Sequence, residues 1–115
     1  MEHLMHLEDE PFEMIKGGRK RVELRLYDEK RRRIELGDII VFRRMDESEE
    51  IRVRVKGLLR FASFRDLFEF VPGEFVGLGN LSIGEKVARM RRYYTEEEER
   101  KYGVLGIWFE IESKE

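Results

Sequence analysis

Residues 20–26 read KRVELRL, and this alternation of charged and apolar side chains indicates the class of the fold. Val22, Leu24 and Leu26 share one face of an extended segment, and the charged residues between them share the other. A period of two predicts a half-buried β-strand. The same alternation returns at 51–56 and at 105–111, so we expect several strands of this kind.

Turn and capping residues delimit the remaining elements. Asp9 is the expected N-cap of a short helix that Gly17 and Gly18 end. The pairs Ser82-x-x-Glu85 and Thr95-x-x-Glu98 have the spacing of a capping box. Expected in chain order are an edge strand over 1–6, a helix over 9–16, strands over 20–26, 38–44 and 50–59, helices over about 63–71, 82–94 and 95–102, and a closing strand over 104–111.

This order of elements predicts an α+β fold. Five short strands with few helical crossovers favour an antiparallel or mixed sheet. A curved sheet or small, partly closed β-barrel would bury the apolar face of each strand, and three to four short helices would cover its ends. Inward positions are Val22, Leu24, Ile40, Phe42, Val53, Val55, Ile107 and Phe109.

Composition limits the class of protein. A chain of 115 residues has the length of one domain, so we expect residues 1–115 to form a single domain. Cysteine is absent, which excludes disulfides, Cys-ligated zinc and a cysteine nucleophile. No apolar run approaches the length of a membrane helix, and a cytoplasmic location is the default expectation. The sequence contains no Gln, one Asn and one Thr, a usage typical of heat-adapted proteins.

The net charge of −2 conceals segregation of charge along the chain. Between Arg19 and Arg33 there are eight basic residues and three acidic ones, and basic residues also dominate 86–92. Acidic residues gather at 2–13 and 96–99. Two interpretations remain open. The segments are either a heat-adapted surface of mixed ion pairs or a basic face for a phosphate backbone, with Arg31, Arg32, Arg33 and Arg91 as contacts.

Aromatic residues divide into two groups. Core positions are expected for Phe12, Phe42, Phe61, Phe64, Phe68 and Phe109. Tyr27, Tyr93 and Tyr94 lie outside this pattern, and the pair Tyr93-Tyr94 ends a basic segment where a base would find a stacking surface, with Tyr94 as the selected contact. Trp108 falls on the outer face of its strand by parity, where it either packs under a helix or lines a cleft.

Gly18, Lys20, Glu23 and Arg25 form the strongest candidate site. Glu23 and Arg25 are two residues apart on one strand face, and Lys20 follows a glycine turn that opens access. Glu23 is suited to accept hydrogen bonds from an exocyclic amine or to act as a base, and the two cations are suited to hold an anion. The alternative is an ion-pair ladder on a solvated face. Because exposed pairs contribute little, substitution of Lys20 or Glu23 is expected to leave stability almost unchanged.

At these residues the sequence resembles a known family. The stretch PFEMIKGGRKRVELR at 11–25, GDIIVF at 37–42 and YGVLGIWF at 102–109 is similar to the ASCH domain of the PUA-like superfamily, in its small archaeal form. The resemblance implies a β-barrel with helices around a cleft and a role in RNA binding. It also implies that Lys20, Glu23 and Arg25 line that cleft.

Enzymatic relatives keep a second function open. Some bacterial members of the family are amidohydrolases that use a lysine, a threonine and a glutamate on acetylated cytidine, and another is a metal-dependent ribonuclease. Lys20 matches the lysine, but the threonine position falls on Glu23, and Thr95 is far away in the sequence. We therefore expect a binding module for RNA or a nucleotide-like ligand. The alternatives are a small hydrolase with Lys20 and Glu23 as catalytic residues, and a protein-interaction adaptor that uses the acidic end.

The other chemistry-bearing residues give weak signals. His3 and His6 are three apart and would face opposite sides of a strand, so they make a poor metal pair, and near the N-terminus we expect both to be exposed. Asp38 follows Gly37 in a pattern that is common in simple turns. The glycines at 73, 77 and 79 do not fit a phosphate-binding loop. We expect no cofactor, no metal site and no membrane partner, and no pattern indicates the oligomeric state.

Overall fold

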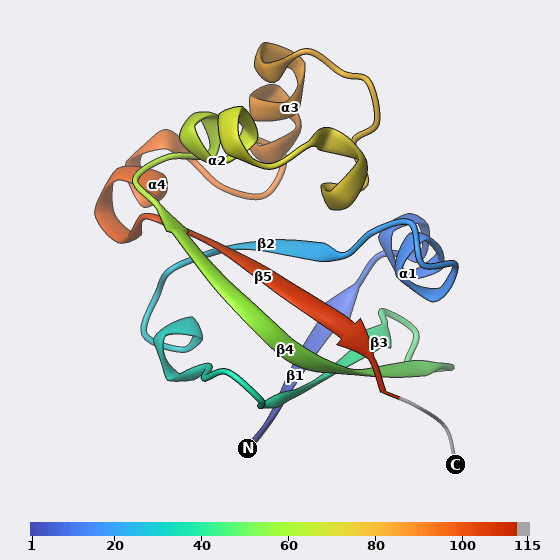
Figure 1. Ribbon diagram of the computed structural model, residues 1–115. Coiled ribbons are helices and arrows are strands. Elements are labelled where there is room, and N and C mark those ends of the chain that lie inside the picture. The colour runs from blue at the N-terminus through green and yellow to red at the C-terminus, as the bar shows by residue number, and fades with distance from the viewer. Residues whose placement is uncertain (113–115) are drawn as a thin grey trace.

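The computed structural model describes residues 1–112. The elements in chain order are β1 (Glu2–Leu7), α1 (Asp9–Lys16), β2 (Val22–Leu26), the 3-10 helix η1 (Arg31–Arg33), β3 (Ile39–Arg44), β4 (Glu50–Phe61), α2 (Phe64–Phe70), the 3-10 helix η2 (Gly73–Val76), α3 (Ile83–Met90), α4 (Glu96–Tyr102) and β5 (Val104–Ile111). The order agrees with the one predicted from alternation and capping, and the α+β class is confirmed (Figure 1).

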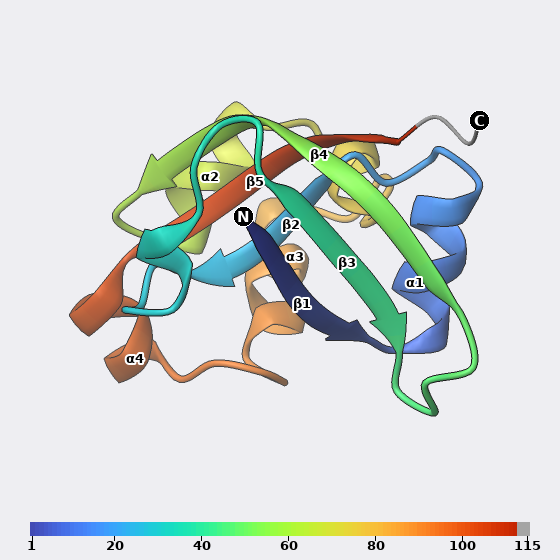
Figure 2. The same cartoon turned by 90° about the horizontal axis from the view of Figure 1, so that it is seen from below.

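The strands within 1–112 form one mixed sheet in the order β1-β3-β4-β5-β2. β1 runs parallel to β3, and the other three pairings are antiparallel. β1 is an edge strand, as predicted, and β2 is the opposite edge. The sheet curls into a half-barrel, which Figure 2 shows from below. The curl brings the two edges together, and Arg25 on β2 donates a hydrogen bond to the main-chain carbonyl of His6 on β1.

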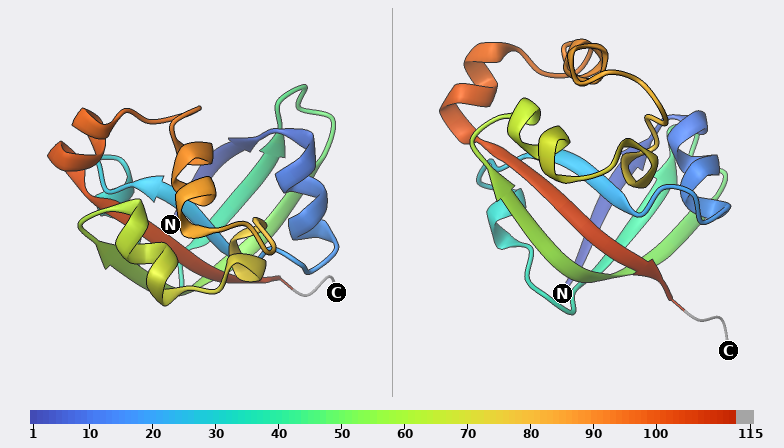
Figure 3. Two further views of the ribbon diagram at one scale, coloured as in Figure 1. Left: turned by 90° about the horizontal axis from the view of Figure 1, so that it is seen from above. Right: turned by 45° about the horizontal axis from the view of Figure 1, so that its top comes forward.

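Apolar side chains form two buried clusters, one on each face of the sheet. The first fills the inside of the curl, where α1 contributes Phe12 and Ile15. The second lies between β2 and helices α2 and α3, which Figure 3 shows gathered on one side of the sheet. Every side chain predicted to face inward is buried: Val22, Leu24, Ile40, Phe42, Val53, Val55, Ile107 and Phe109.

The prediction that β2 is buried on one face only is wrong. Val22 and Leu24 pack toward the helices, and Glu23 on the opposite face is also buried, with 4% of its surface exposed. The physical reason is the curl. Glu23 pairs across the sheet with Ile107, whose side chain lies inside the half-barrel, so Glu23 points to that interior beside the open seam.

The capping residues were predicted more accurately than the helix lengths. Both capping boxes are present, at Ser82 with Glu85 and at Thr95 with Glu98. The N-cap of α1 is Glu8 and not Asp9 as expected, so Asp9 is already helical and the helix begins one residue before the predicted cap would place it. α3 ends at Met90 and not near Tyr94, and the chain leaves the helix through a turn.

Three side chains lie elsewhere than the pattern predicted. Lys86 is buried and its Nζ lies 5.8 Å from the centre of the Phe68 ring, so it is not part of a basic face. Phe61 is only partly buried. Trp108 neither packs under a helix nor lines a cleft, because its ring lies on Gly57 of the neighbouring strand, where a bulge shifts the register.

Ion pairs follow strands β3 and β4. Arg43 pairs with Glu50, Arg44 with Glu13 and Arg54 with Glu112. Arg52 pairs with Glu2 at 2.5 Å. The network agrees with the composition, and a heat-adapted source stays a prediction. No helix within residues 1–112 has both the length and the apolar character needed to cross a membrane.

Candidate functional site

A cleft of about 850 Å³ opens beside the seam between β1 and β2. Its floor is formed by Lys20, Glu23 and Arg25. One wall is the junction of β1 and α1, which carries acidic residues 8–10, and the opposite wall is the end of α3 with the turn that follows it. The three residues predicted to form one site therefore do come together at a concave surface of ligand size.

A glycine turn places Lys20 at this floor. Gly18 adopts a positive φ of 78°, and the main-chain N–H groups of Arg19 and Lys20 both donate to the carbonyl of Met14 at the end of α1. The side chain of Lys20 then runs along Gly77, where an added Cβ would lie 3.3 Å from its Cδ. Gly77 also has a positive φ, so the close approach and the backbone conformation both favour glycine there.

Glu23 is held between the two cations. Its Oε1 lies 2.7 Å from Lys20 Nζ, and its Oε2 accepts from Arg25 Nε at 2.9 Å and lies 2.8 Å from Arg25 Nη2. All three side chains are largely shielded from solvent, with 11%, 5% and 14% of the side chains of Lys20, Glu23 and Arg25 exposed. The ion-pair interpretation is thus correct in its contacts, but the face is not solvated.

The electrostatics of this triad follow from burial and charge. Burial opposes ionisation of Glu23, but the charges of Lys20 and Arg25 and their hydrogen bonds outweigh it and hold the pKa of the carboxyl below its usual value. Burial also opposes the charge on Arg25, and the Glu23 carboxylate outweighs that effect and raises the pKa of the guanidinium. With all three groups ionised, the floor carries one net positive charge.

The triad keeps more free donors than free acceptors. A carboxylate offers about four lone-pair positions, and Glu23 uses three of them within the triad. Lys20 uses one of its three N–H groups on Glu23, and the Nη1 group of Arg25 makes no hydrogen bond within residues 1–112. The floor therefore suits a ligand that presents oxygen acceptors, with room for a single donor toward Glu23.

Aromatic and basic side chains form the wall opposite α1. Tyr94 packs its ring on Phe64 at 5.7 Å between centres, and burial raises the pKa of its hydroxyl. Tyr93 is exposed and spans the cleft mouth, where its hydroxyl donates to Glu8 at 2.6 Å. Arg89 and Arg92 line the same wall, and neither makes an ion pair within the described part of the chain.

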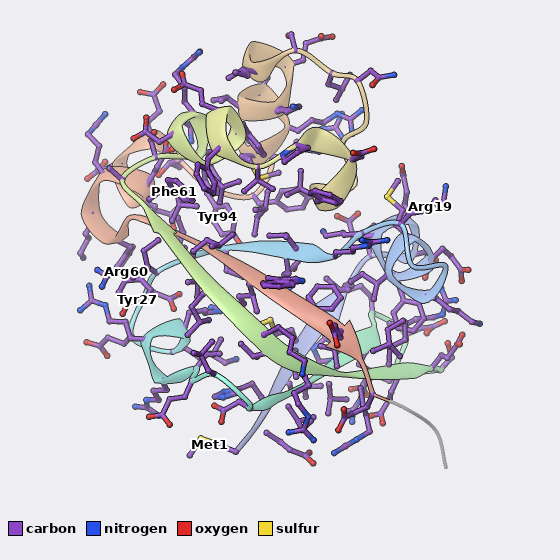
Figure 4. The ribbon with its side chains drawn as sticks, in the orientation of Figure 1. Met1, Arg19, Tyr27, Arg60, Phe61 and Tyr94 are labelled. Atoms are coloured by element: carbon purple, nitrogen blue, oxygen red, sulfur yellow. The ribbon has the colours of Figure 1, made fainter. Side chains whose placement is uncertain are left out.

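The structure separates the other predicted contact residues from the cleft. Arg91 bonds to Glu99 at 2.6 Å and joins α3 to α4. Arg31 pairs with Asp28, and Arg32 and Arg33 are exposed on η1. None of these four arginines lines the cleft among the residues that the structure describes. Tyr94, in contrast, does line the cleft, and Figure 4 labels it among the side chains.

Sequence reasoning did not select Arg89, Arg92 and Tyr93 as site residues, although all three line the cleft. A signal was available in the sequence. Arg89 and Arg92 are three residues apart and Tyr93-Tyr94 follows directly, so six residues of chain carry these two cations and two aromatic rings. The prediction placed Arg91 at the site because its position on the helix face was unknown.

The histidines and Asp38 have structural partners. His3 is not simply exposed as expected, because it bonds to Asp38 at 2.8 Å, and His6 bonds to Glu47 at 3.2 Å. Asp38 also accepts from the main-chain N–H of Glu35, as the turn interpretation predicts. Within residues 1–112 no three His, Cys, Asp or Glu side chains gather as a metal site would require.

Comparison with known proteins identifies the family to which this chain belongs. The profile of the ASCH domain matches residues 5–113. The chain belongs to the ASCH domain family. A crystal structure of hypothetical protein PH0355 is similar to this ASCH domain at 45% identity, with 96% of this chain and 99% of that chain covered and a TM-score of 0.88. The solution NMR structure of protein PF0455 from Pyrococcus furiosus is 44% identical, with 96% and 97% covered and a TM-score of 0.77.

More distant ASCH domains share the fold. The crystal structure of an ASCH domain from Lactobacillus crispatus has a TM-score of 0.66 at 14% identity, with 96% of this chain and 79% of that chain covered. At this identity the likeness shows the fold alone. No curated protein matches this ASCH domain.

Proposed function

We propose that this ASCH domain binds RNA or a nucleotide-derived ligand in the cleft and does not act on it chemically. The observation that supports the proposal is the triad of Lys20, Glu23 and Arg25 at the floor of a cleft of about 850 Å³. Its net positive charge and its surplus of N–H donors favour phosphate or carbonyl oxygens. Nucleotides carry both groups.

The same donor count favours certain bases. Lys20 and Arg25 donate to a carbonyl oxygen, and the remaining lone pair of Glu23 accepts from an exocyclic amine. Cytosine and guanine present a carbonyl oxygen and an amine on one edge. Tyr93 at the mouth supplies a ring on which a base can stack, a contact worth roughly 1–3 kcal/mol per base.

Arg89 and Arg92 extend the positive charge from the floor to the rim. Both are exposed and without an ion-pair partner within residues 1–112, in contrast to Arg43 and Arg44, which pair with carboxylates. Exposed cations that face a cleft attract a polyanion by releasing its counterions. This contrast supports the phosphate-backbone interpretation for the α3 wall.

Two observations weigh against the hydrolase alternative. Glu23 has a lowered pKa and is bonded to two cations, which makes it a poor general base near neutral pH. The hydroxyl of Thr95 accepts from the main-chain N–H of Glu98 as the cap of α4 and does not line the cleft. The matching lysine thus has no threonine beside it in the described part of the chain.

Fluorescence anisotropy with labelled single-stranded RNA at two salt concentrations tests the proposal. The variant carrying Arg89→Ala and Arg92→Ala is expected to bind every sequence more weakly and to show a salt slope that is shallower by about 1.4, or about 0.7 for each lost phosphate contact on a single strand. Arg52→Ala is the matched control, because Arg52 is an exposed arginine paired with Glu2 and does not line the cleft. An affinity that is indifferent to salt would refute the phosphate contacts.

A second measurement separates binding from catalysis. The RNA is recovered after incubation with the domain and analysed by chromatography. We expect unchanged RNA. New products that disappear in Lys20→Ala would establish the hydrolase alternative instead.

A further inference from the structure

A second hollow lies at the other end of β2. It has a volume of about 360 Å³ and shares no lining residue with the cleft. Its lining consists of Tyr27, Arg60, Phe61, Ala62, Tyr102, Gly103 and Val104. Figure 4 marks Tyr27, Arg60 and Phe61 on the side of the molecule away from Arg19. We call this surface the Tyr27 hollow.

Guanidinium groups lie over the ring of Tyr27. The guanidinium carbon of Arg60 is 4.1 Å from the ring centre, and that of Arg32 is 5.2 Å from it. Arg32 also donates through Nε to the main-chain carbonyl of Tyr27, which fixes η1 beside the hollow. Tyr102 also lines the Tyr27 hollow, and Lys101 Nζ lies 5.1 Å from the centre of its ring.

These cations lack the carboxylate partners that the arginines at the other end of β4 have. Within residues 1–112, no carboxylate lies within 4.0 Å of the charged groups of Arg32, Arg60 or Lys101. Arg52 and Arg54, on the same strand as Arg60, each pair with a glutamate. A chain this rich in acidic residues leaves positive charge unpaired at one of its aromatic surfaces, which favours an anion from outside.

The chemistry of the hollow fits a nucleotide. Arg60 offers its guanidinium edge to a phosphate while its face stays on Tyr27. Partly exposed aromatic rings of Phe61 and Tyr102 offer apolar surface to a base. No carboxylate lines the hollow that could accept a hydrogen bond from the exocyclic amine of a base, so the hollow is expected to bind any base.

The position of the hollow connects it to the cleft. Arg25 lines the cleft and Tyr27 lines the hollow, only two residues further along an extended segment, or about 7 Å at the rise of a β-strand. A single-stranded nucleic acid that occupies the cleft can therefore reach the hollow with a neighbouring nucleotide.

We infer that the Tyr27 hollow is a second, sequence-independent contact for single-stranded RNA, in which Arg32 and Arg60 hold a phosphate and the aromatic rings receive a base. The inference rests on the proposed function of the cleft. The sequence predicted Arg32 as a phosphate contact but not its grouping with Arg60 around Tyr27, since Arg60 and Tyr27 are 33 positions apart.

The experiment compares two double variants with labelled oligocytidylate that is long enough to span both surfaces. Arg32→Ala with Arg60→Ala removes the hollow cations, and Arg89→Ala with Arg92→Ala removes the cleft-wall cations. We expect the hollow variant to lose roughly tenfold in affinity and to show a shallower salt slope. Arg52→Ala again serves as the control, and thermal unfolding verifies that each variant is folded.

The outcomes separate the two proposals. Loss of affinity in both double variants supports the hollow as part of one RNA path. Loss in the cleft variant alone overturns the hollow and leaves the proposed function standing. Loss in the hollow variant alone supports an RNA contact at Tyr27 and refutes the cleft. Equal competition by inorganic phosphate and by cytidine monophosphate overturns the assignment of a nucleotide, because these two anions carry similar charge and a simple anion site does not discriminate between them.

Discussion

The guanidinium of Arg25, on β2, donates a hydrogen bond of 3.3 Å to the main-chain carbonyl of His6, on β1. These strands are the two edges of the sheet, and within residues 1–112 no ladder of main-chain hydrogen bonds joins them. The half-barrel is therefore linked across its seam by a side chain. Because Arg25 is oriented by Glu23, the candidate binding site and the closure of the sheet depend on the same ion pairs.

Substitution Glu23→Gln is expected to destabilise the fold strongly. It leaves Lys20 and Arg25 without their carboxylate in a shielded position, and breaking a buried ion pair in this way costs on the order of 3–5 kcal/mol. The sequence predicts almost unchanged stability because it places the ion pair on a solvated face. The structure shows that Glu23 is buried, so that reason does not hold. Urea unfolding followed by circular dichroism measures the change.

Glu110→Gln is the matched control for this substitution. Glu110 is exposed and lies 4.0 Å from Lys56, so its removal is expected to leave the unfolding free energy almost unchanged. Equal stability of the two variants would contradict the role assigned to the triad.

The lowered pKa of Glu23 predicts a dependence of stability on pH. A carboxyl whose pKa is lower in the folded state stabilises the fold fully above its unfolded value, which is about 4.3 for Glu. That contribution disappears as the pH falls through the lowered folded value. We expect the difference in unfolding free energy between the wild type and Glu23→Gln to be largest near neutral pH and to shrink below about pH 4. A difference that grows in acid would show the opposite sign of linkage.

Glu99 is expected to be a second buried carboxylate on which stability depends. It accepts from the main-chain N–H of Phe64 at the start of α2 and from Arg91 at 2.6 Å. Glu99→Gln weakens both bonds, and Arg91 already has an unpartnered buried Nη1. We expect a loss on the order of 2–3 kcal/mol in unfolding free energy, whereas Glu97→Gln, on the exposed face of the same helix, serves as the unaffected control.

Local patterns predicted the fold better than they predicted the site. Alternation identified the buried positions of β2 and β5, and the capping boxes at Ser82 and Thr95 identified two helix starts, because these features depend on neighbours in sequence. The burial of Glu23 depends on the curl, which brings β1 and β2 together from distant parts of the chain. The pairing of Arg91 with Glu99 likewise depends on how α3 and α4 pack. A one-dimensional pattern contains neither relationship.

Gly57 and Gly84 are expected to respond to alanine in opposite directions. An added Cβ at Gly57 would lie 2.8 Å from Cε3 of Trp108, so the indole ring has to move. The expected loss of stability is about 1 kcal/mol, the low end for overpacking, because the ring is partly exposed and can shift. At Gly84, inside α3, a Cβ meets only Ser82 Oγ at 4.0 Å, and alanine is expected to stabilise the helix by about 0.5–1 kcal/mol.

The fluorescence of Trp108 tests the alanine substitutions at Gly57 and Gly84. Trp108 is the only tryptophan in the chain, so its fluorescence reports on the surface around Gly57. We expect Gly57→Ala to shift the emission and Gly84→Ala to leave it unchanged. A stable Gly57→Ala variant with unchanged emission would contradict the contact between the ring and the glycine.

Tyr93→Phe is expected to open the mouth of the cleft. The hydroxyl of Tyr93 donates to Glu8 at 2.6 Å and joins the two walls, and this bond is the largest contribution to the raised pKa of the phenol. A base that stacks on the ring has to displace the bond, whereas phenylalanine keeps the stacking surface without it. Under the proposed function, affinity for single-stranded RNA is expected to increase by roughly two- to tenfold, with faster association.

Glu8→Gln replaces the charged acceptor from the opposite wall and removes a negative charge from the mouth, so it is expected to change affinity in the same direction. Stopped-flow anisotropy measures both rates. Weaker binding by Tyr93→Phe would show that the hydroxyl contacts the RNA itself, and the bond to Glu8 would then be a feature of the unbound protein that does not oppose entry.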